Sequence, residues 1–182
     1  MLETLASIDR QLFYFLNVTC ANGLTDLAMP QITSDWNLRI GYAIVMILIL
    51  WKGNRKSRWL VLGSVIALAV SDLTASALIK PLAGRPRPCH TLTDIHLLVN
   101  CGAGLSMPSS HAANAFAQWA FWSQFATKYR WPLLVIAFLV AVSRVFVGVH
   151  YPGDVLIGSL VGLLVGALVY AIENRLLERH GR

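Results

Sequence analysis

Long runs of apolar residues alternate with short polar segments along most of this chain. About 17–25 apolar residues are enough for one helix to cross a bilayer. Four runs reach that length, and they are Trp59–Ile79, His111–Thr127, Trp131–Val149 and Val155–Ile172. A fifth run, Ile40–Trp51, is short and reaches spanning length only together with residues 32–39. The pattern predicts an all-α, polytopic membrane protein.

The N-terminal stretch Leu5–Met29 is less regular, because charged and polar residues interrupt it. Its apolar residues Leu5, Ile8, Leu12 and Phe15 follow helical spacing, so its first half can lie in the interface or begin a span. We count it as a span. The prediction is then a bundle of six transmembrane helices in a single domain, residues 1–182.

Composition supports a lipid environment and argues against nucleic acid. Hydrophobic residues make up 56% of the chain and charged residues only 13%, whereas soluble domains carry about 25% charged residues. The formal charge of +6 is spread over short segments between the apolar runs and forms no basic stripe. Membrane lipids are therefore the expected surroundings, and no nucleic-acid partner is expected.

The distribution of cations predicts the orientation in the membrane. If the N-terminus is cytoplasmic, ten cations fall on the cytoplasmic side and five on the other. The cytoplasmic set is Arg10, Lys52, Arg55, Lys56, Arg58, Lys128, Arg130, Arg175, Arg179 and Arg182. The opposite set is Arg39, Lys80, Arg85, Arg87 and Arg144. The excess favours cytoplasmic N- and C-termini.

Small residues recur on one face of the last predicted span. Gly158, Gly162 and Gly166 are four residues apart, a spacing that lets two helices approach closely. We expect this face to pack against a helix of the same bundle rather than to form a dimer seam.

Three polar clusters stand at the ends of predicted spans. They are residues 80–88 (KPLAGRPRP), 107–111 (MPSSH) and 143–154 (SRVFVGVHYPGD). One loop joins the first two clusters, so both lie on the same face of the membrane. Two further spans, out and back, return the chain to that face for the third. All three clusters therefore meet on one side.

The residues that meet there predict a phosphate site. They are the cations Lys80, Arg85, Arg87 and Arg144, the histidines His111 and His150, and the carboxylate Asp154. Four cations beside one carboxylate repel one another unless a bound anion offsets their charge. Guanidinium and ammonium groups both bind phosphate well. Ser109 and Ser110 precede a helix whose first N–H groups also favour an oxyanion. Two histidines and a carboxylate suggest a nucleophile, a general acid and an orienting group.

The same residues form a pattern that resembles the type 2 phosphatidic acid phosphatase (PAP2) superfamily. The pattern is K-x6-R-P from Lys80 to Pro88, then P-S-x-H from Pro108 to His111, then S-R-x5-H-x3-D from Ser143 to Asp154. The order, spacing and membrane context all agree with the family. One departure is visible, since Ser110 stands where the family usually has glycine. The added Cβ bears on substrate range more than on activity.

The resemblance implies a role for each catalytic residue. His150 is expected to attack phosphorus and form a phosphohistidine, with Asp154 orienting its other ring nitrogen. His111 is expected to protonate the leaving oxygen and then to activate the hydrolytic water.

The resemblance also implies the residues that hold the phosphate oxygens, which are Lys80, Arg87, Ser109, Ser110 and Arg144. Because these groups supply the charge stabilisation that phosphoryl transfer needs, we expect neither a metal nor another cofactor.

The expected function is that of a bacterial inner-membrane lipid phosphatase whose site faces the non-cytoplasmic side. Phosphatidic acid, phosphatidylglycerophosphate and undecaprenyl diphosphate are the expected types of substrate, a phospholipid or a prenyl diphosphate. Alternatives are a lipid A 1-phosphatase or a lipid phosphotransferase of the same superfamily. A transporter for an anion or a lipid is the alternative from another class.

Several other polar residues remain open. Arg85 lies off the motif, and a contact to the site or to lipid headgroups fits it equally. Asp72 lies mid-span, too deep for the site, so we expect it to form a structural hydrogen bond to a neighbouring helix. A disulfide between Cys89 and Cys101 and two free thiols are both consistent with the sequence.

Overall fold

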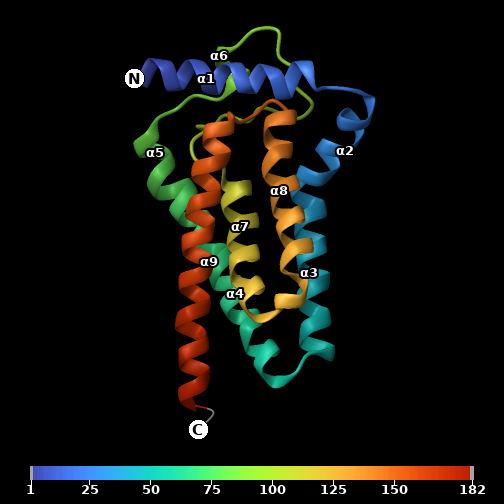
Figure 1. Ribbon diagram of the computed structural model, residues 1–182, viewed down its shortest axis with the longest axis vertical. Coiled ribbons are helices and arrows are strands. Elements are labelled where there is room, and N and C mark those ends of the chain that lie inside the picture. The colour runs from blue at the N-terminus through green and yellow to red at the C-terminus, as the bar shows by residue number, and fades with distance from the viewer. Residues whose placement is uncertain (1, 181–182) are drawn as a thin grey trace.

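Long helices stand side by side in this protein, and one further helix lies across the end of the bundle (Figure 1). The computed structural model describes residues 2–180, and no strand occurs among them. The α-helices are α1 Leu2–Tyr14, α2 Gly23–Thr33, α3 Asp35–Lys52, α4 Arg55–Leu73, α5 Lys80–Ala83, α6 Pro88–Thr91, α7 Ser110–Phe125, α8 Arg130–Phe146 and α9 Pro152–His180. Short π or 3-10 segments are η1 Phe15–Thr19, η2 Thr74–Ile79 and η3 Thr127–Tyr129. The all-α prediction is confirmed.

The described residues contain fewer clear spans than the sequence predicts. Three helical segments are long and apolar enough to cross a membrane, namely Arg55–Thr91, Thr127–Phe146 and Pro152–Arg179. Helices α2 and α3 qualify together as a fourth, bent by 56° at the break between them. Helix α7 has only 16 residues, but it packs against α4, α8 and α9 and lies among them (Figure 1).

Helix α1 is not among the segments that qualify as membrane spans, and this bears on the predicted topology. It lies across one end of the bundle, so the N-terminal end of the chain is at that end and the C-terminal end is at the other (Figure 1). The two ends of the described chain thus lie at opposite ends of the bundle, whereas the sequence prediction puts both termini on the cytoplasmic side. The physical reason is visible in the polar groups of this stretch, because Asp9 and Asn17 both make polar contacts at the end of the bundle instead of entering hydrocarbon.

Asn17 is the anchor that holds the end of this first segment. Its side chain is fully buried, and its amide donates to the carbonyls of His96 and Phe146, both at 2.8 Å. Its Oδ1 accepts the N–H of His96, again at 2.8 Å. One amide thus ties η1 to the loop before α7 and to the C-terminus of α8.

The break between α2 and α3 is encoded by helix-capping residues. Asn22 starts α2 with a capping box that includes Thr25. Ser34 ends α2 and caps α3, its hydroxyl accepting the N–H of Asn37 at 3.4 Å. The break sets Thr33 and Asp35 at the same end of the bundle as α1, where both contact residues of the polar clusters.

The glycine face of α9 packs on α7 within the bundle, as the sequence predicts. A Cβ built on Gly162 would lie 2.1 Å from the Ala113 carbonyl oxygen, and one on Gly166 would lie 2.2 Å from that of Ala117. The two backbones are so close that no side chain fits between them.

Polar side chains inside the bundle form hydrogen bonds between helices. Asn114 of α7 donates to Asp72 of α4 at 3.1 Å, which confirms the structural role expected for this intramembrane acid. Nearer the other end of the bundle, the Ser64 hydroxyl donates to Gln118 at 2.6 Å and accepts the indole N–H of Trp122 at 3.0 Å. These bonds satisfy groups that hydrocarbon would leave unpaired.

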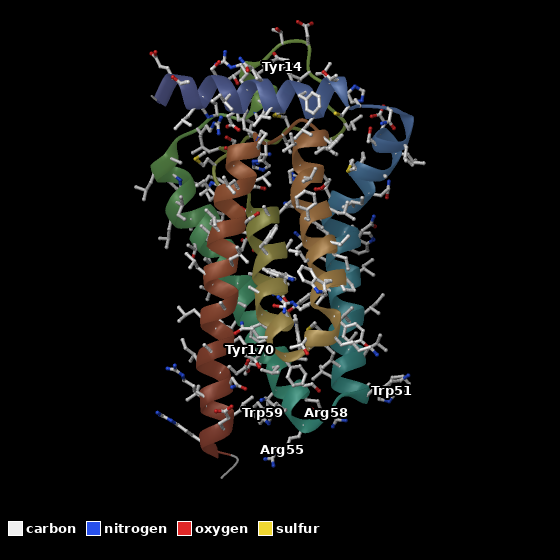
Figure 2. All side chains as sticks on the ribbon, in the orientation of Figure 1. Tyr14, Trp51, Arg55, Arg58, Trp59 and Tyr170 are labelled. Carbon is white, nitrogen blue, oxygen red and sulfur yellow. A yellow bond between two sulfur atoms is a disulfide. The ribbon has the colours of Figure 1, made fainter. Side chains whose placement is uncertain are left out.

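Aromatic and basic residues mark the end of the bundle opposite α1. Trp51, Arg55, Arg58 and Trp59 lie there (Figure 2). Trp51 and Trp59 are exposed, as is typical of a membrane–water interface.

We predict that Gly162→Val destabilises the protein by about 1–3 kcal/mol, because the added side chain must push α7 and α9 apart. Thermal unfolding in detergent, followed by tryptophan fluorescence, measures the effect. Gly41→Ala is the matched control, since a Cβ at Gly41 meets nothing within 4 Å. Equal melting temperatures for Gly162→Val and the unchanged protein would contradict the packing described here.

Candidate active site

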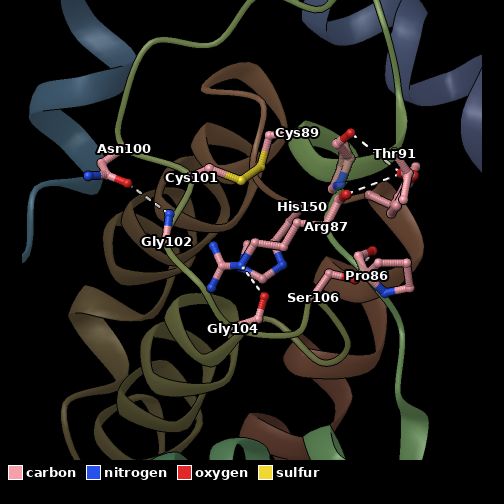
Figure 3. The surroundings of a disulfide bond; sticks show 12 residues. Pro86, Arg87, Cys89, Thr91, Asn100, Cys101, Gly102, Gly104, Ser106 and His150 are labelled. Carbon is pink, nitrogen blue, oxygen red and sulfur yellow. Dashed lines mark hydrogen bonds between the residues drawn. A yellow bond between two sulfur atoms is a disulfide. The ribbon is translucent and has the colours of Figure 1, made fainter.

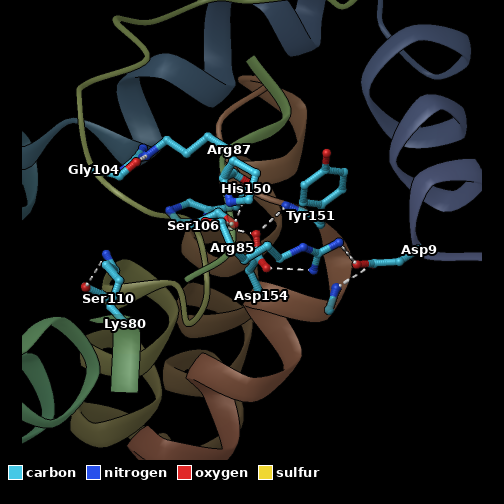
Figure 4. Close-up of polar contacts among 12 residues, drawn as sticks. Asp9, Lys80, Arg85, Arg87, Gly104, Ser106, Ser110, His150, Tyr151 and Asp154 are labelled. Carbon is cyan, nitrogen blue, oxygen red and sulfur yellow. Dashed lines mark hydrogen bonds and ion pairs between the residues drawn. The ribbon is translucent and has the colours of Figure 1, made fainter. Parts of the chain in front are cut away.

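The three polar clusters converge at the end of the bundle that α1 covers (Figure 4). Each functional side chain comes from the end of a helix or from an adjoining loop. Lys80 begins α5, and Arg87 and Ser109 directly precede α6 and α7 without capping them through their side chains. Ser110 and His111 begin α7, and Arg144 is in the last turn of α8. His150 is in the α8–α9 loop, and Asp154 is in the first turn of α9. The number of predicted spans between the clusters therefore correctly predicted that all three lie at the same end of the bundle.

His150 and Asp154 form a buried pair at the centre of this cluster. The side chain of His150 is 3% exposed and that of Asp154 is fully buried. The distance from His150 Nδ1 to Asp154 Oδ2 is 3.5 Å, at the outer limit of a hydrogen bond. With the Nδ1 proton turned toward this carboxylate, the lone pair of the neutral ring is on Nε2.

The surroundings of His150 keep its imidazole neutral. Burial is the largest cause and lowers its pKa from 6.5 to about 4, while the carboxylate of Asp154 acts in the opposite direction. The positive charges of Arg144 and Arg87 also lower this pKa. A neutral imidazole retains a lone pair for nucleophilic attack at physiological pH.

Besides His150 Nδ1, whose contact with Asp154 is long at 3.5 Å, two buried donors of the cluster have no hydrogen-bond partner within the described residues. They are the hydroxyl of Ser109 and the Nε of Arg144. Buried donors of this kind cost free energy unless an acceptor arrives. The backbone N–H of Ser109 already donates to the Asp154 carbonyl at 3.0 Å, so only its side chain remains available. An oxyanion such as phosphate would satisfy both groups.

Lys80 and Arg87 add charge on the side of α5 and α6. Lys80 Nζ lies 3.4 Å from the hydroxyl of Ser110. Arg87 donates through Nε to the carbonyl of Gly104 at 3.1 Å, and within residues 2–180 no hydrogen bond holds its terminal nitrogens. The charges of Arg87 and Arg144 act on His150, and the charge of Lys80 interacts with both arginines.

The loop between α6 and α7 covers this side of the site and is closed by a disulfide. Cys89 and Cys101 are bonded, with their Cα atoms 6.1 Å apart, so the structure selects the disulfide from the two states that the sequence allows. The disulfide lies beside Arg87 and His150 (Figure 3). Ligand atoms of Cys89, His90 and Cys101 fall within 4.8 Å of one another, but the sulfur–sulfur bond leaves no thiolate for a metal.

Two residues that contact His111 were missed by the sequence reasoning, and both flank the α2–α3 break. Asp35 Oδ1 lies 3.2 Å from His111 Nε2, and the carbonyl of Thr33 lies at the same distance from that nitrogen. The hydroxyl of Thr33 accepts a hydrogen bond from Arg144 Nη1. His111 therefore has its own carboxylate partner, as His150 has Asp154. The capping residue Ser34 signals a helix break, but nothing local in the sequence signals contacts to residues more than seventy positions away.

The arrangement can support transfer of a phosphoryl group. It combines a neutral imidazole backed by a carboxylate, a second imidazole, and cations with unpaired donors. These are the elements of nucleophilic catalysis with charge stabilisation.

Comparison with known proteins places this fold and site in one class of membrane enzymes. Residues 58–178 match the model of the PAP2 superfamily, and the chain belongs to that family. The resemblance found in the sequence is thereby confirmed. The chain is a membrane phosphatase of the PAP2 type.

Individual relatives differ in how much of the chain they match. A lipid A 4'-phosphatase from Bacteroides thetaiotaomicron is 32% identical over 98% of this chain and 83% of its own length. The undecaprenyl-diphosphatase BcrC from Bacillus subtilis is 37% identical over 67% of this chain and 62% of its own length.

Two crystal structures share the fold. The Bacillus subtilis PAP2-type phosphatidylglycerolphosphate phosphatase has a TM-score of 0.76 at 26% identity, covering 94% of this chain and 87% of its own. Aquifex aeolicus LpxE has a TM-score of 0.72 at 25% identity, covering 89% and 94% respectively.

We predict that the imidazole of His150 stays neutral on acidification from pH 7 to about pH 5, because its pKa is lowered to about 4. Nitrogen chemical shifts of the histidine-labelled protein in detergent measure this directly. His150→Ala identifies the signal by removing it. A midpoint near 6.5 for this ring would show that burial does not control its charge.

Proposed function

We propose that this protein hydrolyses a phosphate ester of a membrane lipid through a phosphohistidine on His150. In the first step Nε2 of His150 attacks phosphorus, the bond from phosphorus to the lipid oxygen breaks, and His111, in the protonated form that Asp35 favours, donates a proton to that oxygen. In the second step His111 takes a proton from water, whose oxygen attacks phosphorus and releases inorganic phosphate and free His150.

One observation carries this proposal: a buried, neutral His150 lies beside a buried carboxylate and near cations, and the Nε of Arg144 and the hydroxyl of Ser109 are buried donors without a partner in the described residues. Lys80, Arg87 and Arg144 are the groups that would hold the phosphoryl oxygens. The hydroxyl of Ser109, and the backbone and hydroxyl of Ser110 at the start of α7, would add hydrogen bonds. These residues supply the charge stabilisation that phosphoryl transfer requires, so the proposed reaction needs no metal.

We further propose that the site faces the non-cytoplasmic side of a bacterial inner membrane. The disulfide between Cys89 and Cys101 beside the site supports this side, because disulfides persist in oxidising compartments. The basic residues around Arg55 and Arg58 lie at the other end (Figure 2), which fits the positive-inside rule. In this orientation the C-terminus is cytoplasmic and the N-terminus lies outside.

A phosphorylated glycolipid of the lipid A type is the substrate class that we favour. The relative that acts on lipid A matches 98% of this chain, so its similarity extends to the N-terminal helices that place Thr33 and Asp35 at the site. Prenyl diphosphate is the second candidate, because a relative named as an undecaprenyl-diphosphatase matches 67% of the chain.

The test is phosphate release by the purified protein from a panel of lipids in detergent. We predict release from lipid A in excess of that from undecaprenyl diphosphate, phosphatidylglycerophosphate and phosphatidic acid. His150→Ala should reduce release to the blank. Vanadate, which resembles five-coordinate phosphorus, should inhibit, and a chelator should not.

Three outcomes would decide against parts of the proposal. Release of phosphate only when an acceptor lipid is added would indicate a phosphotransferase. No release from any lipid, together with anion flux that survives His150→Ala, would indicate a transporter. If undecaprenyl diphosphate is hydrolysed in preference to lipid A, the proposed substrate is wrong, but the proposed reaction through His150 still holds.

A further inference from the structure

We propose that Asp9 and Arg85 are positioning residues for the nucleophile, and that through them the surface helix α1 holds the catalytic carboxylate in place. The inference rests on the proposed function, since the step it affects is the attack of His150 on phosphorus. Neither residue belongs to the motif that identifies the family.

Arg85 bridges two carboxylates (Figure 4). Its Nη1 donates to Asp154 Oδ1 at 2.8 Å, and its Nη2 donates to Asp9 Oδ2 at 2.6 Å. The other oxygen of Asp154 accepts the N–H of Tyr151 at 2.8 Å. Both oxygens of Asp154 are therefore fixed, and the orientation of the carboxylate toward His150 depends on Arg85.

The plane of the guanidinium is set by an aromatic ring. The centre of the Arg85 guanidinium lies 3.9 Å from the centroid of the Tyr151 ring. Since the donors of a guanidinium lie in its plane, stacking on Tyr151 directs them sideways at the two carboxylates. Phe13 of α1 is fully buried and packs against the same tyrosine, with the ring centroids 5.6 Å apart. Helix α1 thus supports Arg85 by an apolar contact as well as by Asp9.

Asp9 is bound to the N-terminus of α9 as well as to Arg85. Its Oδ1 accepts the N–H of Gly153 at 2.7 Å, a group that has no partner within its own helix. A Cβ on Gly153 would lie 2.9 Å from Asp9 Oδ2. A side chain before Asp154 would therefore make the carboxylate of Asp9 shift from its present position.

The charges explain why the bridge needs both acids. Asp154 and Arg85 alone would neutralise each other, and the imidazole would face no net negative charge. With Asp9 the group carries a net charge of minus one behind His150. When Nε2 binds phosphorus while Nδ1 keeps its proton, the ring becomes positively charged, and this remaining negative charge stabilises it.

The bridge lies behind His150, whereas the groups proposed to hold phosphate are Lys80, Arg87 and Arg144. Arg85 is already engaged by two carboxylates and a tyrosine ring. We therefore expect its removal to slow the chemical step and to leave binding of the lipid largely unchanged.

The experiment measures kcat, KM and the single-turnover rate of phosphohistidine formation for Asp9→Asn and Arg85→Gln, using the full chain in detergent and the best lipid substrate. Each substitution should lower kcat and the single-turnover rate by about 10-fold or more, with KM changed less than about twofold. Glu3→Gln and Arg10→Gln, two exposed charges of α1, are the matched controls and should leave both constants unchanged.

A double-mutant cycle separates positioning from a general effect on the fold. In the Asp154→Asn background, Arg85→Gln should lower the single-turnover rate by less than about twofold, because its target is already lost. Gly153→Ala moves Asp9 without removing a charge and should also lower kcat. It provides the readout if the charge variants do not fold, as judged by thermal unfolding.

The proposal is overturned if Asp9→Asn and Arg85→Gln keep the kcat of the unchanged protein. It is also overturned if Arg85→Gln lowers the single-turnover rate by the same factor in the Asp154→Asn background as in the unchanged protein. A rise in KM alone would make Arg85 a phosphate contact instead. In all these cases the unchanged protein still releases phosphate. If it does not, the proposed function fails and not only this inference.

Discussion

The buried carboxylate of Asp154 beside the buried imidazole of His150 is the constraint on which the rest of the site depends. A fully buried charge is costly unless it is paired and hydrogen-bonded. Here Arg85 and the N–H of Tyr151 are the partners that offset the cost of burying the carboxylate. Asp154 can therefore stay ionised beside the histidine. In return, burial keeps the histidine neutral, and a neutral ring is what a nucleophile requires.

The long helices bring this pair to one end of the bundle, and short elements complete the site. Close packing of α9 on α7, which the glycines of α9 permit, places Asp154 next to the start of α7. Helix α1 lies across this end of the bundle, and the break between α2 and α3 brings Asp35 to the second histidine. The cations would repel one another in an empty site, and a bound phosphoryl group would offset them.

Much of this site could be predicted because its residues stand in short contiguous motifs whose sidedness follows from the number of intervening spans. The motif residues around His111 and His150 were found in this way. Asp35 and Asn17 were not found, because their partners are distant in the sequence and no local pattern encodes such contacts. Helix α1 was counted as a span because its apolar residues have helical spacing, but Asp9 shows that one face of it is bound to protein.

The central claim is that phosphate passes through a covalent bond to His150. It is tested most directly by mixing the protein with a radiolabelled lipid phosphate, stopping the reaction under alkaline conditions that preserve phosphohistidine, and locating the label by peptide mass spectrometry. The account predicts label on His150 and its loss in His150→Ala, while His90→Ala, an exposed histidine, keeps it. Label on another residue, or phosphate release by His150→Ala at the rate of the unchanged protein, would contradict the account.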